Sequence, residues 1–249
     1  MKGWIIPVSL LILAEAFARI HGIASDSLAS PSQILVAAWE ILLDGSLLTR
    51  ASQTLLAALS GLAIGGGLGL FLAVVLGLVP PLARLLRYPI EAFRPIPSIA
   101  TLPIVLMIYG FGYLMEIAVI AFACFWPVLI IGQSAIAGIE PRLIEVSRVL
   151  GLNFFGRATK IALPAAMPRL FLAFRQAAAV SLIVAVTAEI AMNPQGLGFE
   201  LMAAQSSLRP QVMFAILLYV GLIGWSLNAL LLALQRRLFS FAAAAKVSA

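Results

Sequence analysis

The chain has few charged side chains and few of the residues that build metal sites or disulfides. Charged residues make up 10% of its 249 residues, against roughly 25% in a soluble globular domain. It contains one histidine, His21, and one cysteine, Cys124. We therefore expect no intrachain disulfide and no cysteine-based metal site. No Gly-x-x-x-x-Gly-Lys-Ser/Thr motif occurs, so we expect no cofactor, no metal and no ATP hydrolysis by that route in this chain.

Apolar sequence takes the place of the missing charge. Hydrophobic residues make up 63% of the chain and its mean hydropathy is +1.10. Because unpaired backbone groups are costly in lipid, long apolar segments should be helical, and no segment has the two-residue alternation of a barrel strand. The sequence predicts an all-α integral membrane protein with about six spans. These are roughly Trp4–Ile20, Thr54–Val79, Ile96–Gly112, Ile117–Ile139, Leu170–Met192 and Val212–Leu234.

Three segments between the spans carry charges, proline or glycine and are predicted to be loops: Pro80–Pro95, Glu140–Arg169 and Pro194–Gln211. With a cytoplasmic N-terminus, thirteen of the 16 basic residues lie on one side and three on the other. This asymmetry predicts that both termini and the loop 140–169 are cytoplasmic. The basic residues form no compact patch with aromatics between them, so no nucleic-acid partner is expected.

The N-terminus allows two interpretations. Lys2, the apolar run Trp4–Leu13 and Ala14-Glu15-Ala16 are typical of a cleaved signal peptide. Alternatively, the segment is an uncleaved anchor helix in which Glu15 and Arg19 pair at i,i+4 spacing. We favour the anchor.

The expected organisation has three parts. Residues 1–49 form the anchor and an external amphipathic segment, 50–238 form the core permeation domain with its loop 140–169, and 239–249 form a cytoplasmic tail. The amphipathic segment is Pro31–Leu43, which should lie on the outer membrane surface. Its apolar residues on one side are Ile34, Leu35, Ala38 and Leu42.

Small residues recur every four positions along the second span. They are Gly61, Gly65, Gly69, Ala73 and Gly77. This spacing puts all of them on one helix face, where another backbone can approach closely. We interpret the face as a helix-packing seam.

The loop 140–169 has the pattern of a short amphipathic helix. Pro141 suits its first turn and Gly151 suits a left-handed C-terminal stop. A second helical stretch around Phe155–Ile161 should end before Pro164. Periodicity alone leaves two readings open: a surface helix that contacts nothing, or a docking helix for a partner. Its apolar residues are Leu143, Val146 and Leu150, and its charged ones are Arg142, Glu145 and Arg148.

The same loop resembles the "EAA" loop of binding-protein-dependent ABC importer permeases. An acidic residue is followed by glycine six positions on and by Ile-x-Leu-Pro after the expected gap, although Val and Ser replace the two alanines of the pattern. In that family the loop docks in a cleft of the nucleotide-binding subunit. The resemblance therefore implies an ATPase-coupling role for Glu145, Val146, Ser147, Arg148, Gly151, Ile161, Leu163 and Pro164.

Other stretches resemble the nitrate, sulfonate and taurine branch of these permeases. They are Arg94–Ser98, Leu102-Pro103, Gly110–Gly112, Ala188–Ile190 and Gly196–Phe199. The likeness implies a type I importer bundle that carries a small anion across the bacterial inner membrane by alternating access. It also implies a homodimer with two ATP-binding cassette subunits, which bind ATP and Mg, and a periplasmic or lipid-anchored substrate-binding protein.

Four residues are candidates for the pathway: Arg94, Pro97, Ser98 and Glu189. An acidic group at membrane depth is a functional candidate, although Glu189 could instead hold the turn through Asn193–Gly198. Arg175, on the same predicted span, is expected to snorkel.

The rival class is a self-contained secondary transporter or channel, which usually has several charged groups at mid-membrane and internal repeats. The predicted spans are almost free of charge, so we favour the importer permease. An intramembrane hydrolase built on Ser134 lacks a histidine base.

Overall fold

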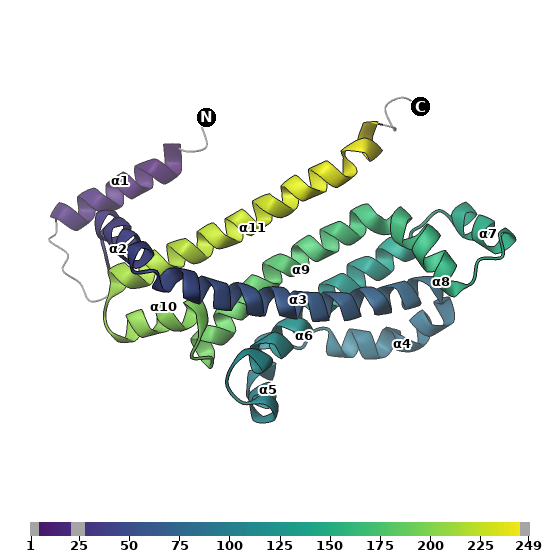
Figure 1. Cartoon of the computed structure of the whole chain (residues 1–249), viewed down its shortest axis with the longest axis horizontal. Helices are drawn as coiled ribbons and strands as arrows, with labels where there is room; N and C mark the ends of the chain where they lie inside the picture. The colour runs from purple at the N-terminus through teal and green to yellow at the C-terminus, as the bar shows by residue number, and fades with distance from the viewer. Residues whose placement is uncertain (1–4, 21–27, 245–249) are drawn as a thin grey trace.

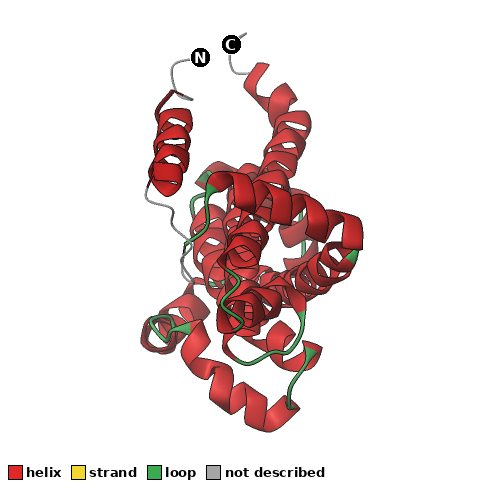
Figure 2. Ribbon diagram, turned by 90° about the vertical axis from the view of Figure 1, so that its left-hand side faces the viewer, coloured by secondary structure: helices red, strands yellow, loops and turns green. Residues whose placement is uncertain are grey.

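The computed structural model describes residues 5–20 and 28–244, which form helices joined by turns, with no strand among them (Figures 1 and 2). The all-α fold class is confirmed. The elements are α1 (Ile5–Ile20), α2 (Pro31–Asp44), α3 (Ser46–Leu78), α4 (Pro80–Phe93), the 3₁₀ turn η2 (Ser98–Thr101), α5 (Leu102–Tyr109), α6 (Tyr113–Ala137), α7 (Pro141–Val149), α8 (Phe154–Arg157), the π-helical turn η3 (Ala158–Ala162), α9 (Leu163–Ala191), α10 (Gly196–Ser206) and α11 (Pro210–Ala244).

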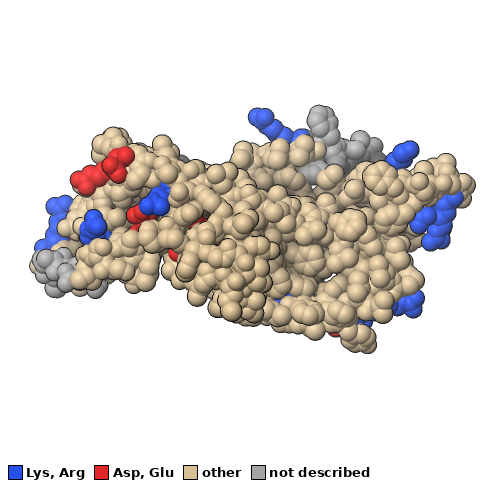
Figure 3. Space-filling view, turned by 60° about the horizontal axis from the view of Figure 1, so that its bottom comes forward, with Lys and Arg blue, Asp and Glu red and all other residues tan. Residues whose placement is uncertain are grey.

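Four helical stretches are long and apolar enough to cross a membrane: Ser46–Leu78, Tyr113–Ala137, Phe154–Ala191 and Pro210–Leu238. The pair Pro80–Phe93 and Ser98–Tyr109, bent by 81°, makes a fifth if it is one broken span. The described part of the first predicted segment, α1, has 16 residues, fewer than the roughly 20 that a span needs. The middle of the face seen in Figure 3 is almost free of charged side chains.

The predictions for the third span and for the loop before it are wrong in detail, because the predicted loop is mostly helical and the span is bent. Pro80–Pro95 is mostly helical, because α4 packs Leu82, Leu86 and Ile90 against buried residues of α3 and α6. The chain then bends by 81° and continues as η2 and α5. Pro95 and Pro97 lie at this bend, and each removes a backbone donor and disfavours helix in the residue before it.

The charged residues of α4 explain the error. They recur every three or four positions and so share the face opposite its apolar residues. Their number alone suggests a loop, whereas their spacing of three or four positions indicates the polar face of an amphipathic helix. They are Arg84, Arg87 and Glu91, followed by Arg94 at the helix end.

The prediction that the helical stretch after Gly151 ends before Pro164 is also wrong. Helix runs without interruption from Phe154 to Ala191. Pro164 lies in the first turn of α9, directly after the π-helical turn η3. A proline ring clashes with the carbonyl four residues earlier, and the wider π turn moves these carbonyls apart. The helix therefore continues through the proline.

The expected division into residues 1–49, 50–238 and 239–249 stays a prediction, although helices run across both of its boundaries. α3 begins at Ser46, so the boundary expected between residues 49 and 50 falls inside this helix. α2 packs on α11, where the Tyr219 hydroxyl donates to the Ala38 carbonyl at 2.7 Å. Leu35 and Leu42 were assigned to the same apolar side as Ala38, yet they are 63% and 40% exposed. α11 continues to Ala244, into the segment expected as a tail.

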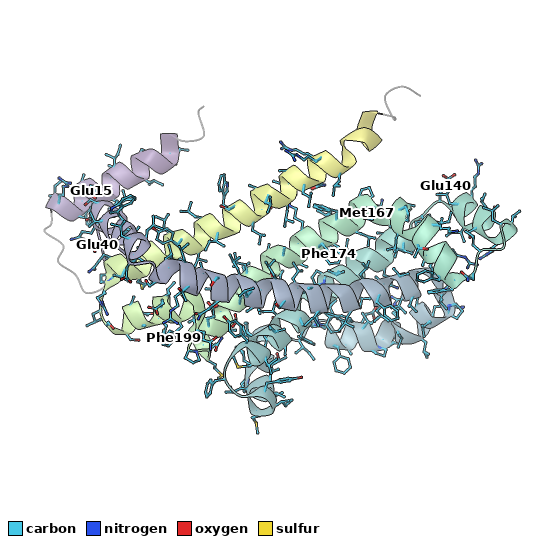
Figure 4. The ribbon with its side chains drawn as sticks, in the orientation of Figure 1. Glu15, Glu40, Glu140, Met167, Phe174 and Phe199 are labelled. Carbon is cyan, nitrogen blue, oxygen red and sulfur yellow. The ribbon has the colours of Figure 1, made fainter. Side chains whose placement is uncertain are left out.

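Hydrogen bonds connect α1 to the start of α2. The Arg19 Nε–H donates to Glu15 at 2.8 Å, which confirms the expected i,i+4 pair. Glu15 also accepts hydrogen bonds from the backbone N–H and the hydroxyl of Ser32, at 3.0 and 2.9 Å. Figure 4 shows Glu15 and Glu40 at the same end of the molecule. His21 lies outside the described residues.

The most extensive helix contact joins α3 and α6. Along this crossing the small residues of α3 face α6. A Cβ added at Gly69 would lie 2.6 Å from the Phe125 carbonyl oxygen, and one at Gly65 would fall against the backbone of Ala121. At Gly61 and Gly77 an added Cβ would instead meet the side chains of Ile120 and Ile136. The two backbones therefore touch where any larger residue would separate them.

At one end of the bundle, buried polar side chains join α3, α6, α9 and α10. Glu189 of α9 accepts a hydrogen bond from the Gly198 N–H of α10 at 2.8 Å, and Thr54 of α3 accepts one from the Leu197 N–H at 3.0 Å. Asn193 donates to Glu116 of α6 at 2.7 Å. We call Thr54, Glu116, Glu189 and Asn193 the polar cluster. All four side chains are almost fully buried.

Each of the two carboxyl groups in the polar cluster, Glu116 and Glu189, has one oxygen, Oε1, without a hydrogen-bond partner among the described residues. The hydrogen bond from Asn193, which follows α9, to Glu116 links the end of α9 to α6 across 77 positions of sequence.

The close contact between α3 and α6 predicts that two nearby glycines of α3 differ in their tolerance of an added side chain. Gly65→Ala should lower the apparent unfolding temperature in detergent, since its Cβ meets the Ala121 backbone. Gly67→Ala, where a Cβ meets nothing within 4 Å, is the matched control. It should be neutral or stabilising by up to about 1 kcal/mol through helix propensity. Equal effects at the two positions would contradict the close α3–α6 approach.

The polar cluster predicts a difference between two substitutions of Glu116. Glu116→Gln should keep an unfolding temperature near wild type, because its amide oxygen can still accept the hydrogen bond from Asn193. Glu116→Leu leaves the buried Asn193 amide without this partner, at a cost of about 1–3 kcal/mol. A loss of several degrees is expected, at roughly 2–4 °C per kcal/mol for a chain of this size. An equal loss for both variants would show that the hydrogen bond from Asn193 to Glu116 does not stabilise the fold.

Candidate functional site

The predicted coupling helix is α7, which projects at the end of the molecule away from the polar cluster (Figure 1). It starts at Pro141 and ends before Gly151, whose φ of 65° is the left-handed conformation expected from the sequence. The Gly151 N–H donates to the Arg148 carbonyl and the Leu152 N–H to the Ser147 carbonyl, both at 3.0 Å. Figure 4 shows Glu140 at the start of this helix.

Only Ser147 of α7 is buried; its hydroxyl donates to the Ile144 carbonyl. The remaining predicted coupling residues of α7, namely Glu145, Val146 and Arg148, are exposed, as is Gly151. Neighbouring apolar side chains are exposed as well, with Val149 at 88% and Leu150 at 65%. A cluster of exposed apolar and charged side chains at one tip of a protein is typical of a partner surface.

The rest of the predicted coupling motif lies where this tip joins the bundle. Ile161 and Leu163 are half-buried and Pro164 is exposed, all within η3 and the first turn of α9. Beside them, Ala158 and Ala162 pack into a core with residues of α3, α6 and α9. The motif thus has two parts, an exposed helix and an anchor that continues directly into α9.

The predicted pathway residues separate into two places. Arg94 and Ser98 line one cavity of about 320 Å³ between the end of α4, η2, α6 and α9, and Pro97 lies between them in sequence. Glu189 does not line this cavity. It belongs to the polar cluster, where its bond to Gly198 fits the alternative role of holding the turn before α10.

The cavity also contains two polar residues that the sequence analysis did not single out, Trp126 of α6 and Gln176 of α9. Glu116 of the polar cluster was missed too. These residues come from helices that are distant in sequence, and a tryptophan or glutamine in an apolar span carries no spacing signal. An acidic residue in the first turn of a span is such a signal, and Glu116 could have been found by it.

Arg175 was expected to snorkel, but its Nε–H donates to Asn228 of α11 at 3.0 Å. This bond is a polar link between α9 and α11. The described residues contain no cluster of three or more His, Cys, Asp or Glu side chains suited to a metal ion.

Comparison with known proteins places residues 65–240 in the family of the "Binding-protein-dependent transport system inner membrane component". The putative aliphatic sulfonates transport permease protein SsuC of Bacillus subtilis is 26% identical over 97% of this chain and 87% of its own length. The taurine transport system permease protein TauC of Escherichia coli is 30% identical over 77% of this chain and 67% of its own.

Among solved structures, the inward-facing MetNI methionine ABC transporter matches with a TM-score of 0.62 at 20% identity. The match covers 84% of this chain and 99% of that chain. At this identity the likeness establishes the fold, that of an ABC importer permease. The relatives establish the lineage and favour an importer permease over a self-contained transporter. The chain belongs to the binding-protein-dependent transport system inner membrane components, and it is an integral membrane permease subunit of an ABC importer.

Proposed function

We propose that this chain forms the translocation pathway for a small anion in a bacterial cytoplasmic membrane. In this proposal two copies form a homodimer, two ATP-binding cassette subunits bind beneath it, and an external binding protein delivers the solute. The chain itself performs no catalysis; ATP and Mg are bound by the ATPase subunits. The names of the relatives, which refer to aliphatic sulfonates and taurine, support a small sulfonate-like anion.

The observation that carries the proposal is the exposed α7 tip. A surface helix without a partner protein would be expected to pack its apolar residues against the bundle. In α7, Leu143, Val146 and Leu150 are all exposed. Apolar side chains beside Glu145 and Arg148 suit a partner that supplies an apolar cleft with a polar rim. An ATPase subunit that receives this helix would explain why its apolar residues are not buried.

The connection of α7 to the bundle is suited to transmit a displacement of α7 to α9. α7 is followed by α8 and η3, which run without a break into the 29 residues of α9. At 1.5 Å per residue α9 is about 44 Å long and reaches the polar cluster at the far end. A displacement of α7 by closing ATPase subunits would therefore move α9 as a rigid body and open the permease halves outward.

The coupling role predicts the phenotype of two substitutions. Glu145→Lys and Gly151→Trp should insert and accumulate normally, yet lower uptake in reconstituted vesicles by about tenfold or more and loosen ATPase co-purification. Both positions are exposed, so the bundle should tolerate the changes. At Gly151 a bulky residue also adds the strain of positive φ.

The chain offers matched controls for both. Glu40→Lys makes the same charge reversal at an exposed position of α2, at the opposite end of the molecule. Gly45→Trp imposes the same strain, since Gly45 has φ 76° and, like Gly151, no atom within 4 Å of an added Cβ. Wild-type uptake and ATPase binding by Glu145→Lys and Gly151→Trp would mean that α7 is not the coupling helix.

The orientation predicts one-sided labelling. In a Cys124→Ala background, Asn153→Cys, next to α7, should react with a membrane-impermeant maleimide only from the cytoplasmic side. Glu40→Cys, at the other end, should react only from outside. The basic asymmetry of the sequence is the physical reason. Efficient labelling of Asn153→Cys in intact cells with a permeabilised outer barrier would overturn the topology.

A further inference from the structure

The cavity beside Arg94 lies at mid-height in the bundle. Trp126, which lines it, is near the centre of the 25-residue helix α6. Gln176 lies thirteen residues before Glu189 on α9, so about 20 Å separates it from the polar cluster. Arg94 follows α4, at the end of about 21 Å of helix that starts at Pro80. The cavity is therefore distant from both ends of α6 and α9 and lies at the end of α4.

The polar groups that line this cavity are mostly hydrogen-bond donors. Arg94 has five N–H groups and no acceptor, and Trp126 has one N–H and no acceptor. The Ser98 hydroxyl and the Gln176 amide can each donate as well. No Asp or Glu lines the cavity, and the remaining lining side chains, such as Ile130 and Val180, are apolar. Such a lining favours an anion with several oxygen acceptors and disfavours a cation.

Two of these donors have no partner among the described residues. The Trp126 Nε1–H is buried and unpaired, although Phe122 and Phe125 hold its ring in edge contacts at 5.7 and 5.0 Å. An orphaned buried donor is rare in folded proteins and needs an explanation. Arg94 takes part in none of the ion pairs between described residues, whereas Arg87, on the same helix face, pairs with Glu91 at 2.9 Å.

A second cavity continues from the first. It has a volume of about 390 Å³ and shares Arg94 and Ile130 with it. Its other polar residues are Arg84, Arg87, Glu91 and Gln133. Since α4 runs from the end of α3 nearest α8 towards Arg94, this second cavity lies on the α7 side of the first. An anion released from Arg94 would meet further cationic side chains in that direction.

We propose that Arg94, Ser98, Trp126 and Gln176 form a binding site for a small monoanionic oxyanion inside the translocation pathway. The proposal rests on the proposed function, because it places the transported anion in contact with these residues. One guanidinium balances one negative charge, and the three neutral donors bind its oxygens. The apolar part of the lining leaves room for a short alkyl group, so an alkanesulfonate should bind more tightly than bare nitrate.

The test uses Trp126 as the reporter. Trp4, Trp39 and Trp225 are replaced by Phe in the full-length chain, which is purified into lipid nanodiscs. Nitrate, ethanesulfonate and ethylammonium are titrated at constant ionic strength while Trp126 emission is recorded. We expect saturable changes with both anions, a lower half-saturation concentration for ethanesulfonate, and no saturable change with ethylammonium.

Substitutions then identify the site. Arg94→Gln should raise the half-saturation concentration of both anions by roughly tenfold or more, the loss expected for a charge-assisted hydrogen bond. Arg237→Gln, at an exposed position of α11 that lines neither cavity, removes the same charge and should change the half-saturation concentration less than about twofold. If Arg94→Gln does not remain monodisperse, Ser98→Ala and Gln176→Leu replace it, with an expected weakening of about two- to tenfold each.

Three outcomes would overturn the proposal: a linear, non-saturating response to both anions, equal effects of Arg94→Gln and Arg237→Gln, or equal affinity for ethylammonium. Uptake by the complex assembled with its ATPase and binding protein separates this failure from that of the proposed function. If that complex transports an anion while Trp126 reports no binding, only the site is wrong. If it transports no anion, the proposed function itself fails.

Discussion

The fold depends on the close approach of α3 and α6. Lipid tails are as apolar as the helix surfaces, so helices in a membrane associate through tight packing and hydrogen bonds and not through expulsion of water. At Gly65 and Gly69 the backbone of α6 occupies the space where side chains of α3 would otherwise lie. α9 then packs across both helices, with Ala177, Ala185 and Ala188 fully buried against them. In Figure 4, Phe174 lies midway along α9; its ring edge would lie 2.8 Å from a Cβ added at Gly66.

The two ends of this three-helix centre differ in chemistry. At one end the polar cluster ties α10 to the centre through buried hydrogen bonds, and an ion pair at 2.7 Å between Arg50 and Glu200 lies near it. Arg50 also lies 5.8 Å from the ring centroid of Phe199, which Figure 4 marks in α10. At the other end α7 is attached through η3 and leaves its apolar residues exposed. The first end is closed by its own contacts, and the second presents a surface suited to another protein. α9 connects the two.

The features of the fold and of the candidate site that the sequence predicts are those with a local sequence pattern. Composition was enough for an all-helical membrane protein, and the four-residue spacing of Gly61, Gly65 and Gly69 pointed to the face that meets α6. The positive φ at Gly151 also followed from its position after an amphipathic helix. The hydrogen bond from Asn193 to Glu116 did not follow, because residues so far apart in sequence meet only through the packing of α6 on α9. Pro164 misled for a physical reason, since a π turn allows a helix to pass through proline.

The same constraints limit which parts of the molecule can move. Sliding α3 along α6 would drive the Ala121 and Phe125 backbone into side chains of α3 that flank its glycines, so a large displacement within this pair is costly. The 81° bend after α4 lies outside this contact, and its prolines have no backbone N–H to lose when the angle changes. α11 is the least buried of the long apolar helices and meets α9 through the Arg175–Asn228 bond. A conformational change therefore costs least where α4, α5 and α11 border the centre. The cavity beside Arg94 lies on this border, so movement of α4 against α6 and α9 would reshape it while the glycine seam stays intact.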